Sequence, residues 1–344
     1  MTDKNTVLKE ALFCKRKDAG KVLCRLCNHN CTIFPGKRGI CAVRENINGT
    51  LFSLNYGRLV AANIDPIEKK PLFHFLPGSD SFSVASAGCN FKCAHCQNYH
   101  IAQLPREHKG EILGELSSPE KIVEAAVKSG CRSIAYTYTE PTIYFEFALE
   151  TAKLAKAEGL KNIFVSNGYT GEDAVRTIAP YLDGNNIDLK SFSDEHYRKI
   201  CGASLQPVLD NIRLMRSLGV WLEVTTLVIA GYNDGDDELR SIAEFIASVS
   251  LDIPWHVSRF YPAYKMADLS PTPVKTLINA RSIGQEAGLH YVYVGNIPGG
   301  TGEDTDCPLC GRVLIKRFGY SVECNHLKDG CCSHCKNPIA GVWA

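Results

Sequence analysis

Apolar positions along the middle of the chain follow two alternating patterns. Short apolar runs are typical of strands buried in a parallel sheet, and they recur at FSVASAG (82–88), SIAYTYTE (133–140), NIFVSNG (162–168), NIDLKSF (186–192), WLEVTTLVIAG (221–231), WHVSRF (255–260) and YVYVGN (291–296). The segments between these runs carry apolar residues at helical spacing, for example Ile122, Val123 and Ala126. Ser117 and Glu120 are expected to form a capping box at the start of that helix.

Strand–helix units repeated in this order predict right-handed crossovers and a parallel sheet. Six or seven units over about 220 residues favour a barrel over a short open sheet. The expected fold class is therefore α/β, a partial (β/α)6-type parallel barrel with small cysteine-rich metal modules at both ends. The predicted domains are an N-terminal cysteine-rich module with a hairpin near 49–64 (1–80), the barrel (81–300) and a zinc-ribbon-like tail (301–344).

Composition places the chain among ordinary globular proteins. Of its 344 residues, 45% are hydrophobic and 22% are charged, which is enough apolar material for a sizeable core. The net charge of +1 argues neither for nor against a nucleic-acid partner, whereas the absence of a Lys/Arg tract argues against non-specific binding of phosphate. No stretch approaches the length of a membrane span, and the N-terminus carries no apolar run, so a cytoplasmic location is expected.

The sixteen cysteines are therefore expected to serve as metal ligands or catalytic groups, as is usual in a reducing compartment. Most of them fall into three groups: Cys24, Cys27, Cys31 and Cys41; Cys89, Cys93 and Cys96; and Cys307, Cys310, Cys324, Cys331, Cys332 and Cys335. The isolated Cys14, Cys131 and Cys201 are interpreted as small apolar core residues.

The middle group lies in a loop directly after a predicted strand. Three thiolates spaced as C-x3-C-x2-C can bind three irons of a cubane and leave the fourth iron open to another ligand. A zinc ion would need a fourth ligand, which His95 or His100 could supply. The loop opens at the carboxyl end of a barrel strand, where active sites lie, and this position favours the cluster over a structural zinc.

This triplet resembles the signature of radical S-adenosylmethionine (SAM) enzymes. The resemblance implies that Cys89, Cys93 and Cys96 bind a catalytic [4Fe–4S] cluster and that SAM chelates the open iron. His95 would then flank the adenine. The implied activity is reductive cleavage of SAM to a 5′-deoxyadenosyl radical, which abstracts hydrogen from a protein or small-molecule substrate.

The same resemblance implies SAM contacts at the ends of later strands. Thr139 and Glu140 stand where the superfamily contacts the methionyl amine, although Tyr138 and Thr139 replace the two usual glycines. The remaining candidates for SAM binding are Ser166, Asn167, Asp188, Lys190, His256 and Arg259. Structural alternatives stay open: a helix start at Glu140, a turn after Ser166, and an ion pair between Asp188 and Lys190.

A closer resemblance covers nearly the whole chain. The segments CRLCNHNCTIFPGKRGICAVREN, PIEKKPLFHFLPGS, CQNYHIA and the final GVW resemble the radical SAM member of the AmmeMemoRadiSam system, a branch related to pyruvate formate-lyase activating enzymes. This implies Memo-like and AMMECR-type companion proteins and a one-electron reductant such as ferredoxin or flavodoxin. Activation of a glycyl-radical enzyme is the alternative activity within this class.

The two flanking cysteine groups are expected to bind metal, with zinc as the expected ion. Spacing alone does not choose between zinc and a second iron–sulfur cluster at Cys24, Cys27, Cys31 and Cys41, and His29 could compete as a ligand. In the tail, Cys307, Cys310, Cys332 and Cys335 form two C-x2-C pairs typical of a zinc ribbon. Cys324, Cys331 and His326 leave that ligand set ambiguous.

Two functions without SAM chemistry remain as alternatives. A zinc-ribbon module that binds protein or nucleic acid would place basic or aromatic residues around the cysteines, and only Lys316, Arg317 and Phe318 suggest this. An iron–sulfur electron carrier would have no need of Glu140 and Ser166 at strand ends. The flanking modules could also serve as docking surfaces that the metals merely fold.

Overall fold

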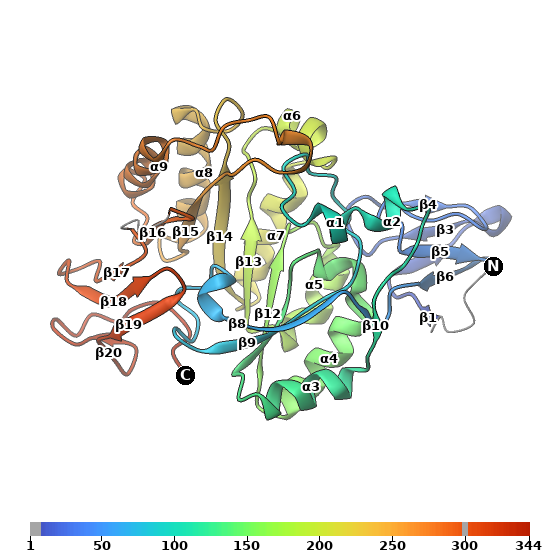
Figure 1. Cartoon of the computed structure of the whole chain (residues 1–344), viewed down its shortest axis with the longest axis horizontal. Helices are drawn as coiled ribbons and strands as arrows, with labels where there is room; N and C mark the ends of the chain where they lie inside the picture. Colours follow the sequence, from blue (N-terminus) through green and yellow to red (C-terminus); the bar gives the residue numbers. More distant parts are fainter. Residues whose placement is uncertain (1–7, 298–301) are drawn as a thin grey trace. The chain divides into compact units, whose positions relative to one another are not determined.

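The structure is a computed structural model that describes residues 8–297 and 302–344 (Figure 1). The chain forms two compact units. Unit 1 contains residues 8–64 and 81–183, and unit 2 contains 65–80 together with the described residues from 184 to 344. The predicted boundaries near 80 and 300 remain a prediction, since the compact units group the N-terminal module with the first half of the barrel segment.

Unit 1 is built on three parallel strands. β11 (Ser133–Tyr136) lies between β9 (Asp80–Ala85) and β12 (Lys161–Ser166) and pairs in parallel with both. Helices α3 (Pro119–Lys128) and α4 (Phe145–Ala157) pack against each other and against β11. Most residues of these strands are buried, as expected where helices connect parallel strands and cover the sheet.

The N-terminal part of unit 1 consists of short antiparallel strands. β1 (Lys9–Glu10), β6 (Thr50–Ser53) and β5 (Arg44–Ile47) form one sheet, and β2 (Cys14–Arg16), β3 (Val22–Cys24) and β4 (Thr32–Ile33) form another. The further elements of unit 1 are β7 (Arg58–Leu59), α1 (Tyr99–Ala102), α2 (Leu104–Glu107), β10 (Glu115–Leu116) and α5 (Glu172–Ile178). The strand β8 (Ala61–Pro66) carries the chain from unit 1 into unit 2.

Unit 2 continues the parallel strand–helix pattern. Its strands β13 (Gly184–Asp188), β14 (Trp221–Val228), β15 (Trp255–Arg259) and β16 (Val292–Gly295) pair in that order, all parallel. The helices between them are α6 (Asp194–His196), α7 (Gln206–Ser217), α8 (Asp236–Val249) and α9 (Val274–Glu286). Helix α9 packs on β15, β16 and α8, so its apolar residues cover one face of these strands.

The tail of unit 2 is a small β module. β17 (Thr305–Asp306), β18 (Val313–Phe318) and β19 (Ser321–Asn325) form an antiparallel sheet, and β20 (Leu327–Lys328) pairs with β21 (Cys331–Cys332). Its apolar core includes Leu314, Ile315 and Ile339 and joins Phe73, Tyr291 and Tyr293 of the same unit. The tail therefore folds against unit 2 and is not an isolated finger.

The predicted α/β class and the parallel strand–helix units are confirmed, and three local predictions need correction. The helix cap is Ser118, whose Oγ accepts from Lys121 N at 3.4 Å, and not Ser117. The first hairpin joins β5 to β6 across Asn48 and lies earlier than 49–64. Cys14 is exposed, whereas Cys131 and Cys201 are buried as expected.

No helix within residues 8–297 and 302–344 combines the length and apolar character that crossing a lipid bilayer requires.

Candidate active site

The central cysteine loop follows β9 in unit 1, and a glycine at its entry and two polar side chains fix its backbone. Gly88 adopts a φ of +109°, and a Cβ at this position would lie 2.8 Å from Val43 Cγ1, so the loop entry requires glycine. Arg106 donates to the carbonyl oxygens of Phe91 at 2.7 Å and Cys89 at 2.5 Å. Gln103 donates to the same Phe91 carbonyl at 3.2 Å. Side chains from α1–α2 thus hold the loop in place before any cofactor binds.

The thiols of this loop suit a cluster bound through thiolates. Cys89, Cys93 and Cys96 form no disulfide with one another or with any other cysteine in the part of the chain that the structure describes. Burial, with Glu140 nearby, raises the pKa of the Cys89 thiol, so a bound cation is needed to stabilise the thiolate. Phe91 N lies 3.3 Å from Cys89 Sγ, and Asn167 Nδ2 lies 3.9 Å from it. Hydrogen bonds of this kind to sulfur adjust the potential of iron–sulfur clusters.

A buried donor beside the cysteines has no partner among the described residues. Asn90 Oδ1 accepts from Asn167 Nδ2 at 2.7 Å, which orients the Asn90 amide. Its Nδ2 is buried and makes no hydrogen bond within residues 8–297 and 302–344. Burying an amide donor without an acceptor costs free energy, and a sulfide-bearing cluster would supply that acceptor. The residues of the loop therefore fit a [4Fe–4S] group.

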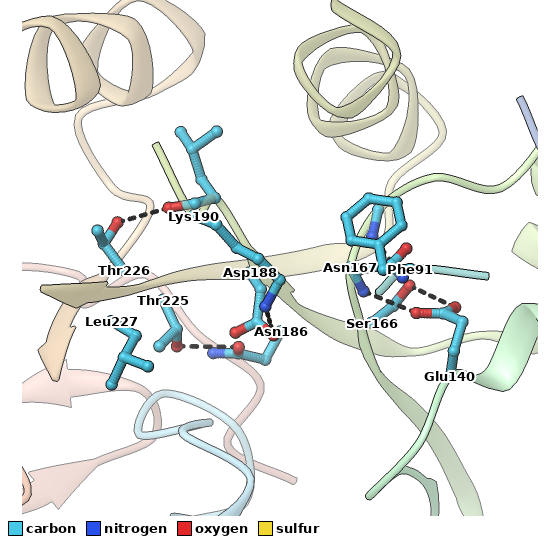
Figure 2. A network of polar contacts seen from close by, with 12 residues as sticks. Phe91, Glu140, Ser166, Asn167, Asn186, Asp188, Lys190, Thr225, Thr226 and Leu227 are labelled. Atoms are coloured by element: carbon cyan, nitrogen blue, oxygen red, sulfur yellow. Dashed lines mark hydrogen bonds and ion pairs between the residues drawn. The ribbon is translucent and has the colours of Figure 1, made fainter. Parts of the chain in front are cut away.

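Glu140 lies after β11, at the centre of a buried polar network (Figure 2). Its Oε1 accepts from Thr142 N at 3.0 Å, Thr142 Oγ1 at 2.6 Å and Ser166 Oγ at 2.9 Å, and its Oε2 accepts from Asn167 N at 2.8 Å. The residue is 1% exposed, and burial raises the pKa of its carboxyl even though these hydrogen bonds oppose the shift. Glu140 also caps the short helix Pro141–Tyr144, so the predicted helix start exists alongside the network.

Ser166 ends β12, Asn167 follows it, and both turn toward Glu140 (Figure 2). Ser166 Oγ also accepts from Gly168 N at 3.1 Å, and Asn167 Oδ1 accepts from Tyr169 N at 3.0 Å, so the turn expected here is present. Thr139 Oγ1 donates to Ser86 O at 2.8 Å, and His95 is buried in the cysteine loop. Unit 1 thus connects Glu140, Ser166 and Asn167 to Cys89 of the triplet in one network.

In unit 2, Asp188 and Lys190 form an ion pair at the end of β13. Lys190 Nζ lies 2.8 Å from Asp188 Oδ2, with the lysine side chain 14% and the aspartate 36% exposed. Lys190 is held through its backbone, since Tyr197 OH accepts from its N–H at 3.1 Å and Asn233 Nδ2 donates to its carbonyl at 2.8 Å. The structural pair left open by the sequence is therefore present, and it stays partly accessible.

His256 and Arg259 lie on β15 and make contacts within unit 2. His256 Nε2 donates to Glu223 Oε2 at 2.6 Å, and the His256 ring stacks on Tyr293 with centroids 5.2 Å apart. Burial opposes ionisation of Glu223, yet the hydrogen bond and charge of His256 hold the pKa of Glu223 below its usual value. Arg259 Nε donates to Thr272 O at 2.7 Å. SAM binding by either residue stays a prediction.

Comparison with known proteins places this geometry in a family. Residues 83–246 match the model of the radical SAM superfamily. An uncharacterized protein of Methanocaldococcus jannaschii is 45% identical over 92% of this chain and 93% of its own length. The pyruvate formate-lyase-activating enzyme of Clostridium pasteurianum is 22% identical over 47% of this chain and 67% of its own length. The structure of Streptococcus suis SuiB bound to its precursor peptide SuiA covers 67% of this chain and 51% of that one, with a TM-score of 0.50 and 14% identity.

Residues 83–246 of this chain form a radical SAM domain. The protein is an enzyme that uses a [4Fe–4S] cluster and SAM to generate a radical by reductive cleavage of SAM. The likeness to SuiB shows the α/β fold of this superfamily and nothing about substrate. The matched range includes the triplet, Glu140, Ser166, Asn167, Asp188 and Lys190, whereas His256 and Arg259 lie beyond it.

This radical SAM enzyme gathers four tail thiols as the sequence predicts. The Sγ atoms of Cys307, Cys310, Cys332 and Cys335 all lie within 4.8 Å of one another and could hold a metal ion. Backbone hydrogen bonds from Cys335 and His334 lower the pKa of the Cys332 thiol, which favours its thiolate, whereas burial and hydrogen bonds with the neighbouring thiols raise the pKa of Cys335. Cys324, Cys331 and His326 are not part of this group.

The N-terminal cysteines of the enzyme line one pocket in unit 1. Cys24, Cys27, Cys31 and Cys41 are joined there by His29 and Arg44, with Thr142 and Ile143 from the barrel side. His29 Nε2 donates to Asn90 O at 2.8 Å, so this ring nitrogen is engaged with the triplet loop. All four cysteines therefore line the same pocket, and their binding of a metal stays a prediction.

Three residues of the site were not found from the sequence. Asn90 lies inside the triplet, and its position between two cluster cysteines is a usable signal. Arg106 and Thr142 gave no signal, because their partners are carbonyl oxygens and a carboxylate that the fold alone brings near.

Proposed function

We propose that Cys89, Cys93 and Cys96 hold the [4Fe–4S] cluster and that Glu140 binds the methionyl ammonium of SAM. The observation that carries this assignment is the charge of Glu140. Its carboxylate is 1% exposed, yet no Lys, Arg or His within residues 8–297 and 302–344 forms an ion pair with it. A buried carboxylate without a cation is costly. An ammonium group on the ligand would supply the missing charge.

The hydrogen bonds to Glu140 support the same role. Oε1 accepts from three donors, which fixes the carboxylate, whereas Oε2 accepts only from Asn167 N. A carboxylate oxygen has room for a further donor. Asn167 connects this group to Asn90 and Cys89, so the ligand site and the cluster loop share one network. When bound, the cluster and SAM supply one-electron cleavage of the sulfonium carbon–sulfur bond.

Two further residues, Asp188 and Lys190, are proposed to contact SAM. Asp188 and Lys190 are partly accessible and lie at the carboxyl end of a parallel strand, the edge at which α/β barrels place their active groups. Lys190 would attract the SAM carboxylate, and Asp188 would hold Lys190 in position. His256 is not advanced as a contact, because Glu223 already engages its Nε2.

The proposed substrate and partners are supported by the relatives and not by the geometry of the site. The activating-enzyme relatives support a one-electron reductant, such as ferredoxin or flavodoxin, and a substrate protein. We propose hydrogen abstraction from a protein or small molecule, with a glycyl-radical enzyme as the alternative substrate. Memo-like and AMMECR-type proteins are proposed companions on the strength of the sequence resemblance, and zinc is the proposed metal of the tail quartet.

The test compares SAM binding and cleavage in matched variants. Anaerobic wild-type enzyme, reduced with dithionite and given SAM, is expected to form 5′-deoxyadenosine, and a Cys89→Ala, Cys93→Ala, Cys96→Ala variant is expected to form none. Glu140→Gln should weaken SAM binding by about 10- to 100-fold at unchanged iron content, because a hydrogen bond to a charged group is lost. Glu124→Gln, on the exposed face of α3, is the control and should bind normally.

Two results would overturn parts of the proposal. A wild-type enzyme with a full cluster in the triplet that never cleaves SAM would remove the assigned chemistry. If Glu140→Gln binds SAM as tightly as the wild type, Glu140 only positions Ser166 and Asn167.

A further inference from the structure

The N-terminal pocket differs from a zinc site in the spacing of its thiols. A single zinc at about 2.3 Å from four sulfurs places neighbouring sulfurs about 3.8 Å apart. The tail meets this spacing, with Cys307 Sγ 3.6 Å from Cys335 Sγ and Cys310 Sγ 3.8 Å from Cys332 Sγ. Within residues 8–297 and 302–344, the tail quartet is the only group of three or more Cys, His, Asp or Glu whose ligand atoms all lie within 4.8 Å.

The N-terminal thiols line one pocket without reaching that spacing. Cys24, Cys27, Cys31 and Cys41 surround the same space, yet no three of them come within 4.8 Å of one another. The three thiols of the triplet are likewise not within 4.8 Å of one another, and in radical SAM enzymes such a triplet binds a [4Fe–4S] cubane. A polynuclear cluster is held at its corners by one cysteine per iron, so its thiolates stand farther apart than those around one zinc. The N-terminal spacing therefore fits a cluster.

Arg44 gives the pocket a buried positive charge. The guanidinium is 1% exposed, lines the pocket and forms an ion pair with Glu146. Its Nη1 donates to Leu12 O at 3.1 Å, whereas its buried Nε has no hydrogen-bond partner in the part of the chain that the structure describes. Glu146 balances the charge of the guanidinium, so the unused Nε calls for a hydrogen-bond acceptor. A thiolate-bound cluster carries negative charge and sulfur acceptors.

The pocket also adjoins the triplet loop within unit 1. A Cβ on Gly88, the residue before Cys89, would lie 3.5 Å from Cys41 O. Arg106 links the same two segments, because its Nε donates to Ile40 O at 2.9 Å and its Nη2 to Cys89 O at 2.5 Å. The backbone at Cys41 and the backbone before Cys89 are thus in contact, so metal centres bound by these two cysteines would be close neighbours.

We propose that Cys24, Cys27, Cys31 and Cys41 bind a second iron–sulfur cluster, which exchanges single electrons with the cluster of the triplet. A low-potential one-electron donor of the ferredoxin or flavodoxin class would lose one electron to the second cluster, which would pass that electron on to the triplet cluster. No bond forms or breaks and no proton moves in either transfer. The electron-transfer role rests on the function proposed above, whereas cluster binding by the pocket does not.

The first measurement is the metal content of anaerobically purified protein. The wild type should contain about eight irons with matching sulfide and about one zinc per chain. The triplet variant Cys89→Ala, Cys93→Ala, Cys96→Ala should keep about half of the iron and show the electron paramagnetic resonance signal of a reduced cluster. Adding Cys24→Ser and Cys27→Ser should abolish that iron. Cys14→Ser is the matched control. Cys14 is an exposed thiol on β2, opposite Cys24 of β3, and its replacement should leave the iron content unchanged.

Each outcome is decisive. About four irons and about two zincs in the wild type, or zinc without iron in the triplet variant, would overturn the second cluster even if SAM cleavage proceeds. If any variant fails to fold, the wild-type stoichiometry alone gives the same decision. For electron transfer, the fully reduced wild type should show spin–spin broadening that disappears when either cysteine set is removed. If both clusters are present but no broadening is seen, cluster binding by the pocket would still hold and electron exchange between the two clusters would be refuted.

Discussion

The two flanking cysteine modules of this radical SAM enzyme share the C-x2-C element and differ in what holds their thiols. In the tail, two tight turns each present a C-x2-C pair, and Gly311 N donates to Cys307 O at 2.9 Å as Lys336 N donates to Cys332 O at 3.0 Å. At the N-terminus, the cysteines lie on separate strands and loops around a pocket that the barrel side closes with Thr142 and Ile143. The tail brings its thiols together through its own turns, whereas the N-terminal module does so against the catalytic segment of unit 1.

This difference shows why spacing alone did not choose the metal. A C-x2-C pair fixes only two neighbouring ligands, and the other two depend on contacts distant in sequence. In the tail, those contacts are a small apolar core of Leu314, Ile315 and Ile339. At the N-terminus they include Asn28, whose N–H donates to Tyr169 O at 3.0 Å directly after the SAM-binding candidates Ser166 and Asn167. Three changes test the contrast between the two modules.

The largest effect is expected in the tail. A Cys307→Ser, Cys332→Ser variant should lose the zinc proposed for the quartet and unfold the tail, because both side chains belong to its small core and metal binding supplies on the order of 10 kcal/mol in such modules. Zinc analysis and limited proteolysis measure the two losses. Cys324→Ser with Cys331→Ser is the control and should retain the zinc, as neither thiol belongs to the quartet. A protease-resistant tail without zinc would show that the apolar core suffices.

The second effect is a pH dependence in the region of unit 2 that the tail covers. Burial lowers the pKa of His74 to about 4, and the neutral ring donates from Nδ1 to Ala340 O at 2.7 Å and accepts from Tyr293 OH at 2.6 Å. A pKa lower in the folded than in the unfolded state stabilises the fold above about pH 6.5, and this contribution is lost as the pH falls toward 4. The loss should approach about 3 kcal/mol.

Urea unfolding at pH 7 and pH 5, followed by tryptophan fluorescence, measures this effect, since Trp343 lies 5.3 Å from the His74 ring. His74→Gln removes the titration and should show a smaller change between the two pH values than the wild type. Equal changes in both proteins would place the pH dependence on other groups.

The sequence predicted those features that depend on local pattern. The parallel strands were found because each is an apolar run, and the resemblance to radical SAM enzymes singled out Glu140, Ser166 and Asn167 near the ends of two of them. The ion pair of Arg44 with Glu146 was not predicted, because 102 residues separate the partners. The same holds for His256 and Glu223, which lie on neighbouring strands. Their pairing depends on which strands become neighbours and on what else is buried nearby, and a single sequence does not carry that information.

The smallest effect concerns how the N-terminal module docks. Gly171 and Gly235 cap α5 and α8 with nearly the same backbone, at φ −68° and ψ 147° and at φ −68° and ψ 144°. A Cβ on Gly171 would lie 2.4 Å from Arg25 O, whereas a Cβ on Gly235 meets nothing within 4 Å. Gly171→Ala should therefore cost about 1–3 kcal/mol by forcing the backbone before Leu26 and Cys27 away, and Gly235→Ala should be near neutral.

Thermal unfolding of the two alanine variants gives the comparison directly, and iron content sharpens it. If the pocket holds a cluster, the displaced Cys27 should lower the iron of Gly171→Ala and leave its zinc unchanged, because the tail quartet lies in the other unit. Equal stability and equal iron in the two variants would mean that the N-terminal module tolerates displacement at this point. Its cysteines would then be held by their own loops, as those of the tail are, and the contrast between the modules would disappear.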